Sequence, residues 1–225
     1  MSSKTSHNRT PLSHFRAIGK KTRHRLLFLA SIALTPLSAL AHHPLGGRQP
    51  ETALEGLLSG IGHPVIGLDH LAFIIAAGLL AAIARRGLLI PLGFVAGSMA
   101  GVGLHLQLFT IPAVELFIAA SVVLVGALLT MKQRLDVRKE AILTAVAGVF
   151  HGYAYAEAIV GANMATLASY LTGLTLVQMV MALGSYLLAA RLLKGESLAD
   201  NRPLRLVGLA ISSIGAAFFA MAAMA

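Results

Sequence analysis

The chain has 225 residues and no cysteine, and 56% of its residues are apolar while only 12% are charged. Soluble domains carry about 25% charged residues. This composition, with a mean hydropathy of +0.78, therefore places the chain among membrane proteins and excludes an intrinsically disordered chain. The absence of cysteine excludes a disulfide scaffold, a thiolate metal site and a cysteine nucleophile.

The formal charge of +9 does not indicate a nucleic-acid partner, because the basic residues are concentrated in a leader. Seven of the 18 Lys and Arg residues lie before residue 26, where there is no acidic residue. From residue 42 onward, eleven basic and nine acidic residues leave a net charge of +2. We expect no binding to nucleic acid.

The leader has the order of a secretory signal peptide. A basic stretch is followed by the apolar run Leu26–Leu37 and then by small residues around Leu40. Twelve apolar residues span only ~18 Å as a helix, which is too short for a bilayer core of ~30 Å. We therefore predict a signal peptide over residues 1–41, with an uncleaved anchor helix as the alternative.

Six apolar segments follow, each about long enough to cross a membrane once. The predicted fold class is an all-α integral membrane protein with about six transmembrane helices after a cleavable signal peptide. Residues 42–225 would form a single polytopic domain. An amphipathic stretch over 51–62 precedes the first span, and Pro64 is expected to separate the two. The predicted spans are 65–84, 88–106, 112–131, 141–160, 165–190 and 204–224.

The loops predict the orientation. Ten of the eleven basic residues after residue 41 follow spans one, three and five, and only Arg48 lies on the other side. The positive-inside rule places these basic loops in the cytoplasm and both ends of the mature chain outside. The loops are short and contain no phosphate-binding loop, so we expect neither an ATPase nor another enzyme, and no resident cofactor.

Ionisable residues occur within these spans, where an acid at mid-bilayer costs ~2.5–3.5 kcal/mol on insertion scales. In the predicted orientation they collect between the outer surface and the midplane, as in the entrance to a cation pathway. Histidine and carboxylate ligands without a thiolate suit Ni²⁺, Co²⁺ or Zn²⁺. The residues are His63 beside the first span and, inside the spans, Asp69, His70, His105, Glu115, His151 and Glu157.

Two groups of these residues are the strongest metal candidates. His63 and His70 are seven residues apart, and Pro64 and Gly67 would let the backbone bend between them. The alternative is an interfacial His63 and an Asp69 that caps a helix starting at His70.

In the second group, His151 and Glu157 are six residues apart, so ligation of one ion by both needs a bend or another span. Gly148 and Gly152 would allow another helix to approach His151. The alternative for His151 is a buried ring bonded to a carbonyl. Weaker candidates are His105, Glu115 and the pair His42 and His43 at the predicted mature N-terminus.

At these residues the chain resembles the HupE/UreJ family of bacterial nickel permeases. The resemblance rests on a block from His63 to Phe73, a block from Phe150 to Glu157, and the start at His42. Its HX₅DH spacing is also similar to the HX₄DH motif of the NiCoT nickel–cobalt permeases. The second block departs from the family pattern because Tyr155 and Ala156 stand where a His and a Gly are usual.

The resemblance implies uptake of Ni²⁺, or Co²⁺ in some lineages, across the bacterial inner membrane for hydrogenase, urease or cobalamin assembly. The expected partners are thus a divalent metal ion, as substrate, and the lipid bilayer; a homo-oligomer stays open. We expect His63, Asp69 and His70 to form the main site and His151 and Glu157 to complete it or form the next station. His105 and Glu115 would line the outer mouth.

Two other readings remain open at this point. One is a membrane metal-binding accessory protein that does not transport. The other is a membrane-embedded metalloenzyme, although the HExxH motif is missing.

Overall fold

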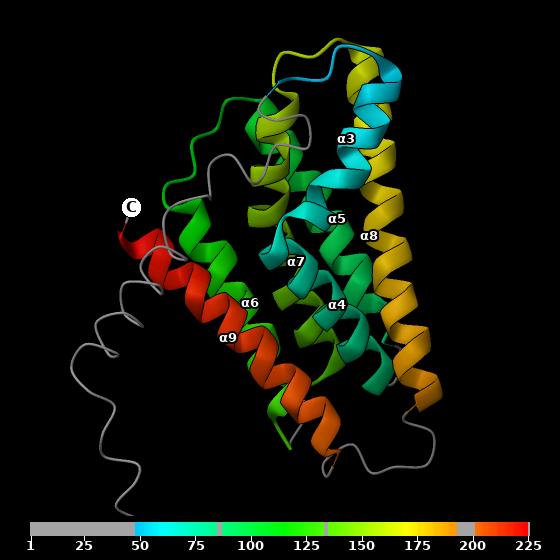
Figure 1. Ribbon diagram of the computed structural model, residues 1–225, viewed down its shortest axis with the longest axis vertical. Coiled ribbons are helices and arrows are strands. Elements are labelled where there is room, and N and C mark those ends of the chain that lie inside the picture. The colour runs from blue at the N-terminus through cyan, green and yellow to red at the C-terminus, as the bar shows by residue number, and fades with distance from the viewer. Residues whose placement is uncertain (1–47, 85–86, 133–134, 193–200, 225) are drawn as a thin grey trace, which may run out of the picture. The chain divides into compact units, whose positions relative to one another are not determined.

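The computed structural model describes residues 48–84, 87–132, 135–192 and 201–224, and every regular element in these ranges is a helix (Figure 1). The predicted signal peptide and the candidates His42 and His43 lie outside the described residues. The helices are α3 (Ala53–Ile66), α4 (Leu68–Ile83), α5 (Leu89–Leu106), α6 (Val114–Thr130), α7 (Val137–Ala156), the 3₁₀ turn η2 (Glu157–Ile159), α8 (Met164–Leu192) and α9 (Arg202–Met224).

Four helices are long and apolar enough to cross a membrane alone: α5, α7 with η2, α8 and α9. The pair α3 and α4 meets the same test only when taken together, so the described residues contain four or five candidate spans. The third apolar segment forms α6, which has 17 residues and is shorter than the candidate spans. Its N-cap residue Ala113 has a φ of 56°, a left-handed conformation that starts the helix later than the sequence predicts.

The first predicted span is wrong in one respect, because the chain bends at Gly67 and not at Pro64. α3 continues through Pro64 to Ile66, and α4 then leaves at 80°. Gly67 has an extended ψ of 103°, donates its N–H to the His63 carbonyl at the end of α3, and accepts from Leu71 at the start of α4. Pro64 lies inside α3, where it removes one helical N–H donor three residues before the bend at Gly67.

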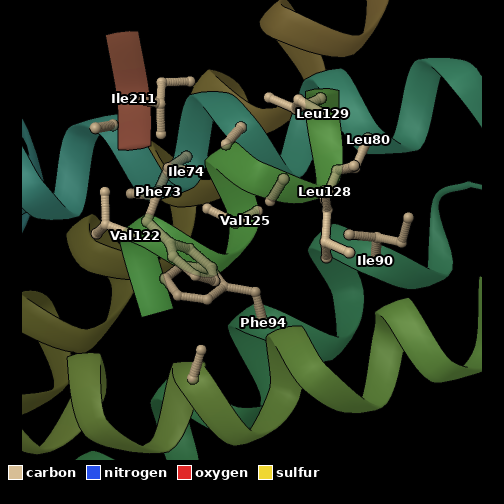
Figure 2. Close-up of a cluster of buried hydrophobic side chains, with 14 of the residues drawn as sticks. Phe73, Ile74, Leu80, Ile90, Phe94, Val122, Val125, Leu128, Leu129 and Ile211 are labelled. Carbon is tan, nitrogen blue, oxygen red and sulfur yellow. The ribbon is translucent and has the colours of Figure 1, made fainter. Parts of the chain in front are cut away.

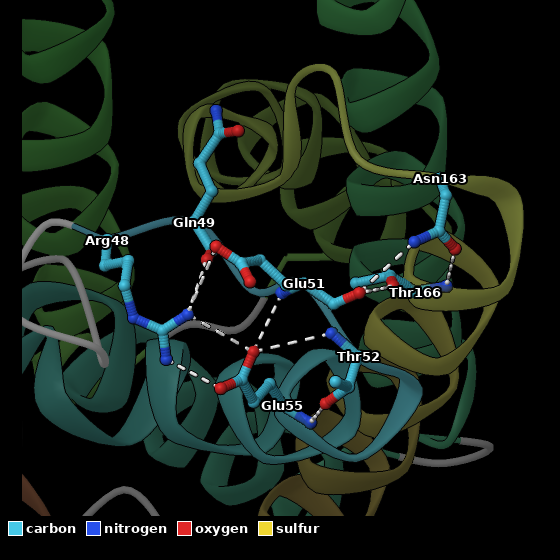
Figure 3. A network of polar contacts seen from close by, with 7 residues as sticks. All are labelled: Arg48, Gln49, Glu51, Thr52, Glu55, Asn163 and Thr166. Atoms are coloured by element: carbon cyan, nitrogen blue, oxygen red, sulfur yellow. Dashed lines mark hydrogen bonds and ion pairs between the residues drawn. The ribbon is translucent and has the colours of Figure 1, made fainter.

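A polar network fixes the start of α3 (Figure 3). Thr52 caps the helix through a reciprocal capping box with Glu55, and Glu55 also forms an ion pair of 2.6 Å with Arg48. This partner raises the pKa of the Arg48 guanidinium further above its ordinary value, so Arg48 stays charged. The Glu51 carbonyl accepts from the side chains of Asn163 and Thr166, which attaches the start of α3 to the start of α8.

Close backbone contacts hold the helices together. The sequence predicts a packing seam at Gly93, Gly97 and Gly101, and α5 indeed contacts α7 along these glycines. A Cβ atom on Gly97 would lie 2.0 Å from the Ala145 carbonyl oxygen, so only glycine fits there. Gly148 and Gly152 form the facing surface of α7 and pack against the backbone of α5.

An apolar core lies beside these contacts, with side chains from α4, α5, α6 and α9 (Figure 2). Phe73 of α4 and Phe94 of α5 are each 1% exposed, and their ring centroids lie 4.9 Å apart. Both rings also contact His151, at centroid distances of 4.6 and 5.5 Å. The hydrophobic core therefore forms one wall of the site that contains this histidine.

Candidate metal-binding site

Three of the candidate histidines lie together inside the helix bundle. His63 comes from the last turns of α3, His70 from the first turn of α4 and His151 from α7, and none is more than 2% exposed. His63 and His70 are seven positions apart, which in an unbroken helix would separate their Cα atoms by about 10 Å. The bend at Gly67 instead leaves their ring centroids 6.0 Å apart.

Hydrogen bonds join this histidine cluster to two further helices, α6 and α8. The Nδ1 atoms of His70 and His151 lie 2.7 Å apart, and Nε2 of His151 lies 3.0 Å from the Ser121 hydroxyl on α6. Nδ1 of His63 lies 3.0 Å from the hydroxyl of Tyr170 on α8. The cluster thus depends on side chains that are far apart in the sequence.

Tyr155 closes the cluster on another side. Its ring centroid lies 5.1 Å from that of His63 and 4.5 Å from that of His70. The side chain is fully buried. Tyr170 in turn donates to the Tyr155 main-chain carbonyl at 2.7 Å, which connects α8 to this part of α7.

Asp69 is 1% exposed, and its Oδ1 accepts from the N–H of His70 at 2.8 Å. α4 starts one residue before Asp69, so this carboxylate lies within the first turn and is not the cap of a helix starting at His70. An acidic side chain in the first turn of a helix is stabilised by the positive end of the helix dipole. The interfacial alternative for His63 is also wrong, since that ring is buried.

The other candidates lie elsewhere. His105 stacks against Tyr153 at a centroid distance of 4.2 Å and bonds to its main-chain carbonyl at 2.9 Å. Glu115 is exposed in the first turn of α6, and Glu157 is exposed where η2 begins. The predicted pairing of His151 with Glu157 is therefore replaced by contacts of His151 with His70 and Ser121.

As it stands, the cluster is held by hydrogen bonds. Within the described ranges, no three His, Asp or Glu side chains are placed to hold a metal ion together. Two nitrogens that bind one ion at 2.0–2.1 Å lie about 2.9–3.4 Å apart in tetrahedral or octahedral geometry. The 2.7 Å between the Nδ1 atoms of His70 and His151 is shorter, and it matches a hydrogen bond.

Sequence reasoning missed Ser121 and Tyr170, the two hydroxyl residues that bond to the histidines. A serine or tyrosine in an apolar span carries no local signal of such a role. The buried Gln178 of α8 also joins two helices, because its Nε2 donates to the Ser98 hydroxyl of α5 at 3.1 Å. Tyr155 was visible only as a departure from the family pattern.

These features define a helical, multi-pass membrane protein with buried histidines at a broken helix. The family model described as "HupE / UreJ protein" matches residues 29–218, and the chain belongs to the HupE/UreJ family. Protein HupE of Rhizobium leguminosarum bv. viciae is 27% identical to it over 186 residues, which cover 81% of this chain and 94% of that protein. No solved structure matches the chain. The family resemblance seen in the sequence is thereby confirmed.

Proposed function

We propose that the protein carries a divalent transition-metal ion, Ni²⁺ or Co²⁺, inward across the bacterial inner membrane. The ion is the substrate, and it would supply the assembly of a nickel or cobalt enzyme such as hydrogenase, urease or a cobalamin-dependent enzyme. The observation that carries the proposal is the cluster of His63, His70 and His151, which is buried among apolar helices at the break between α3 and α4.

The chemistry of the cluster supports this assignment. Neutral imidazoles bind Ni²⁺, Co²⁺ and Zn²⁺ well, and the chain contains no thiolate to retain the ion. The buried carboxylate of Asp69 supplies negative charge next to His70. Moving the rings of His70 and His151 apart by less than 1 Å would bring their nitrogens to the spacing that a shared ion requires.

The arrangement of the helix ends agrees with the predicted orientation. The start of α3 bonds to the α7–α8 connection through Gln49 and Val160, and the α5–α6 connection bonds to Tyr153 through Phe109. These connections hold none of the basic loop residues, and we assign them to the outside. In this proposal, α3 and α4 form one broken crossing, α6 is a short third crossing that brings the total to six, and both chain ends lie outside.

We propose a role in transport for each candidate residue that the structure describes. Glu115, Glu157 and His105 lie near the outer connections and would receive the ion from water. His63, Asp69 and His70 would form the main site. His151 would complete that site or form the next station. Binding must stay modest, because an ion that is carried across has to leave the site.

Purified protein in proteoliposomes should carry ⁶³Ni²⁺ into the vesicles without any other protein. Transport by this chain alone separates a permease from an accessory protein or a metalloenzyme, both of which would bind a metal ion without moving it. Vesicles without protein and vesicles with His63→Ala protein are the controls. Binding without transport would reject the permease.

Transport should fall as the pH is lowered from 7.5 to 5.5. A free imidazole protonates near pH 6.5, and a protonated imidazole has no lone pair to bind a metal ion. The loss should therefore follow protonation of ligands on the entry side, in assays with constant inner pH. A rate that stays flat over this range would contradict histidine ligation.

A further inference from the structure

We propose that the Nε2 atoms of His63 and His70 bind the metal ion, and that Tyr170, His151 and Ser121 are positioning residues that hold these two rings in the required tautomers. This inference deepens the proposed function and rests on it for the identity of the ion. It changes the role of His151 from a ligand to a partner that orients His70.

The argument begins at Ser121. A hydroxyl has one proton, and Ser121 donates it to the Ile118 carbonyl at 2.7 Å. Its oxygen can therefore only accept from the ring of His151, 3.0 Å away, so Nε2 of His151 carries a proton. A neutral His151 then has its lone pair on Nδ1.

The contact between His151 and His70 then determines the tautomer of His70. Since Nδ1 of His151 is an acceptor, the 2.7 Å contact between the two Nδ1 atoms requires His70 to be the donor. A neutral His70 with its proton on Nδ1 has its lone pair on Nε2. That lone pair is what a metal ion needs.

The same reasoning applies independently to His63. Tyr170 donates its only hydroxyl proton to the Tyr155 carbonyl at 2.7 Å, so its oxygen must accept the 3.0 Å bond from Nδ1 of His63. Nε2 of His63 therefore also carries a lone pair. Two separate networks, through α6 and through α8, thus give the same tautomer to both histidines.

The two rings are close to the spacing that one shared ion requires. With metal–nitrogen bonds of 2.0–2.1 Å, the centroids of two imidazoles on one ion lie about 4.5–5.2 Å apart in tetrahedral or cis-octahedral geometry, so the two rings would have to approach each other by about 1 Å. The centroids of His63 and His70 are 6.0 Å apart and their planes meet at 74°. Metal-binding histidines generally donate their other ring N–H to an outer partner, the role that Tyr170 and His151 fill.

The test is ¹⁵N NMR of the metal-free full chain in nanodiscs, with labelled histidine and with peaks assigned by His63→Gln, His70→Gln and His151→Gln. We expect His63 and His70 to carry their protons on Nδ1 and His151 on Nε2. In Ser121→Ala, His70 should lose this preference. In Tyr170→Phe, His63 should lose it.

Matched controls separate positioning from general damage. Thr130→Val removes a hydroxyl of the same helix that makes the same local bond as Ser121, and Tyr186→Phe removes one from the helix of Tyr170. Neither should change the histidine tautomers. The Kd for Ni²⁺, measured by calorimetry, should rise about 10–100-fold in Ser121→Ala and Tyr170→Phe, the usual effect of losing an outer partner. Ser121→Thr should restore it.

Each outcome decides the inference. A wild-type His70 or His63 that carries its proton on Nε2 would overturn it, as would the expected tautomers without Ni²⁺ binding. Ni²⁺ binding with the expected tautomers, but without transport in proteoliposomes, would support the ligand assignment and count only against the permease. The failure of the proposed function can therefore be told apart from the failure of this inference.

Discussion

Cells that depend on this protein for nickel should lose ⁶³Ni²⁺ uptake when Asp69 is replaced by asparagine or His63 by alanine. Asp69→Asn is the sharper change, because an asparagine Oδ1 can still accept the N–H of His70. The variant removes the negative charge and leaves the start of α4 intact. Uptake should fall to background if that charge attracts the cation to the buried histidines.

His63→Ala removes a proposed ligand and the partner of Tyr170 at once. Its uptake should also fall to background, and His63→Gln tests whether a polar side chain without an imidazole is enough. His105→Gln changes a residue of the proposed outer mouth, since His105 bonds to the Tyr153 carbonyl and lies outside the histidine cluster. It should lower uptake only in part, and less than His63→Ala does.

The measurement needs a host without its own nickel importers, equal amounts of protein in the membrane, and Co²⁺ as a competitor. Wild-type uptake that Asp69→Asn retains would show that the buried charge is dispensable. Equal losses in His105→Gln and His63→Ala would contradict a site confined to the cluster. Competition by Co²⁺ would show how closely the site discriminates between the two ions.

Much of the fold follows from the sequence because a bilayer allows few solutions. Each of the six apolar segments forms a helix, and the glycine seam at Gly93, Gly97 and Gly101 packs as its spacing predicts. The sequence offers Pro64 and Gly67 as points where the backbone could bend and separates the first span at Pro64, whereas α3 in fact runs through Pro64 to Ile66. The choice of Gly67 over Pro64 depends on the packing of α3 and α4 against α8, which is a tertiary contact.

The site is predictable in part for a similar reason. Histidines and an acid stand out in apolar spans, so His63, Asp69, His70 and His151 can be selected from the sequence alone. Their contacts depend on the tertiary arrangement, which brings α6 and α8 against them. Ser121 is one hydroxyl among several in the spans, and only the structure shows that it faces His151.

Replacing Gly152 by alanine should be among the most damaging changes in the protein. A Cβ atom there would lie 1.9 Å from the Ser98 carbonyl oxygen and 2.6 Å from the Ser98 Cα, which are backbone atoms that no rotamer change can move. Overpacking of this kind costs typically 1–3 kcal/mol and occasionally more. The whole stability of a protein is only about 5–15 kcal/mol.

The effect on function should exceed the effect on stability, because Gly152 adjoins His151. Separating α5 from α7 would move His151 away from Ser121 and His70, whose bonds are 3.0 and 2.7 Å long. We therefore expect Gly152→Ala to lose Ni²⁺ uptake even in the fraction that remains folded. Uptake that persists would place the metal path away from this contact.

Gly103→Ala is the matched control for Gly152→Ala, because Gly103 lies on α5 and a Cβ atom there would meet nothing within 4 Å. Alanine is favoured over glycine within a helix by roughly 0.5–1 kcal/mol, so Gly103→Ala should be neutral or stabilising. The two variants add the same methyl group, but only Gly152→Ala should lower the melting temperature. Since the chain has no tryptophan, circular dichroism at 222 nm or size-exclusion after heating in detergent should follow unfolding. Equal shifts would mean that the close approach of α5 and α7 does not hold the bundle together.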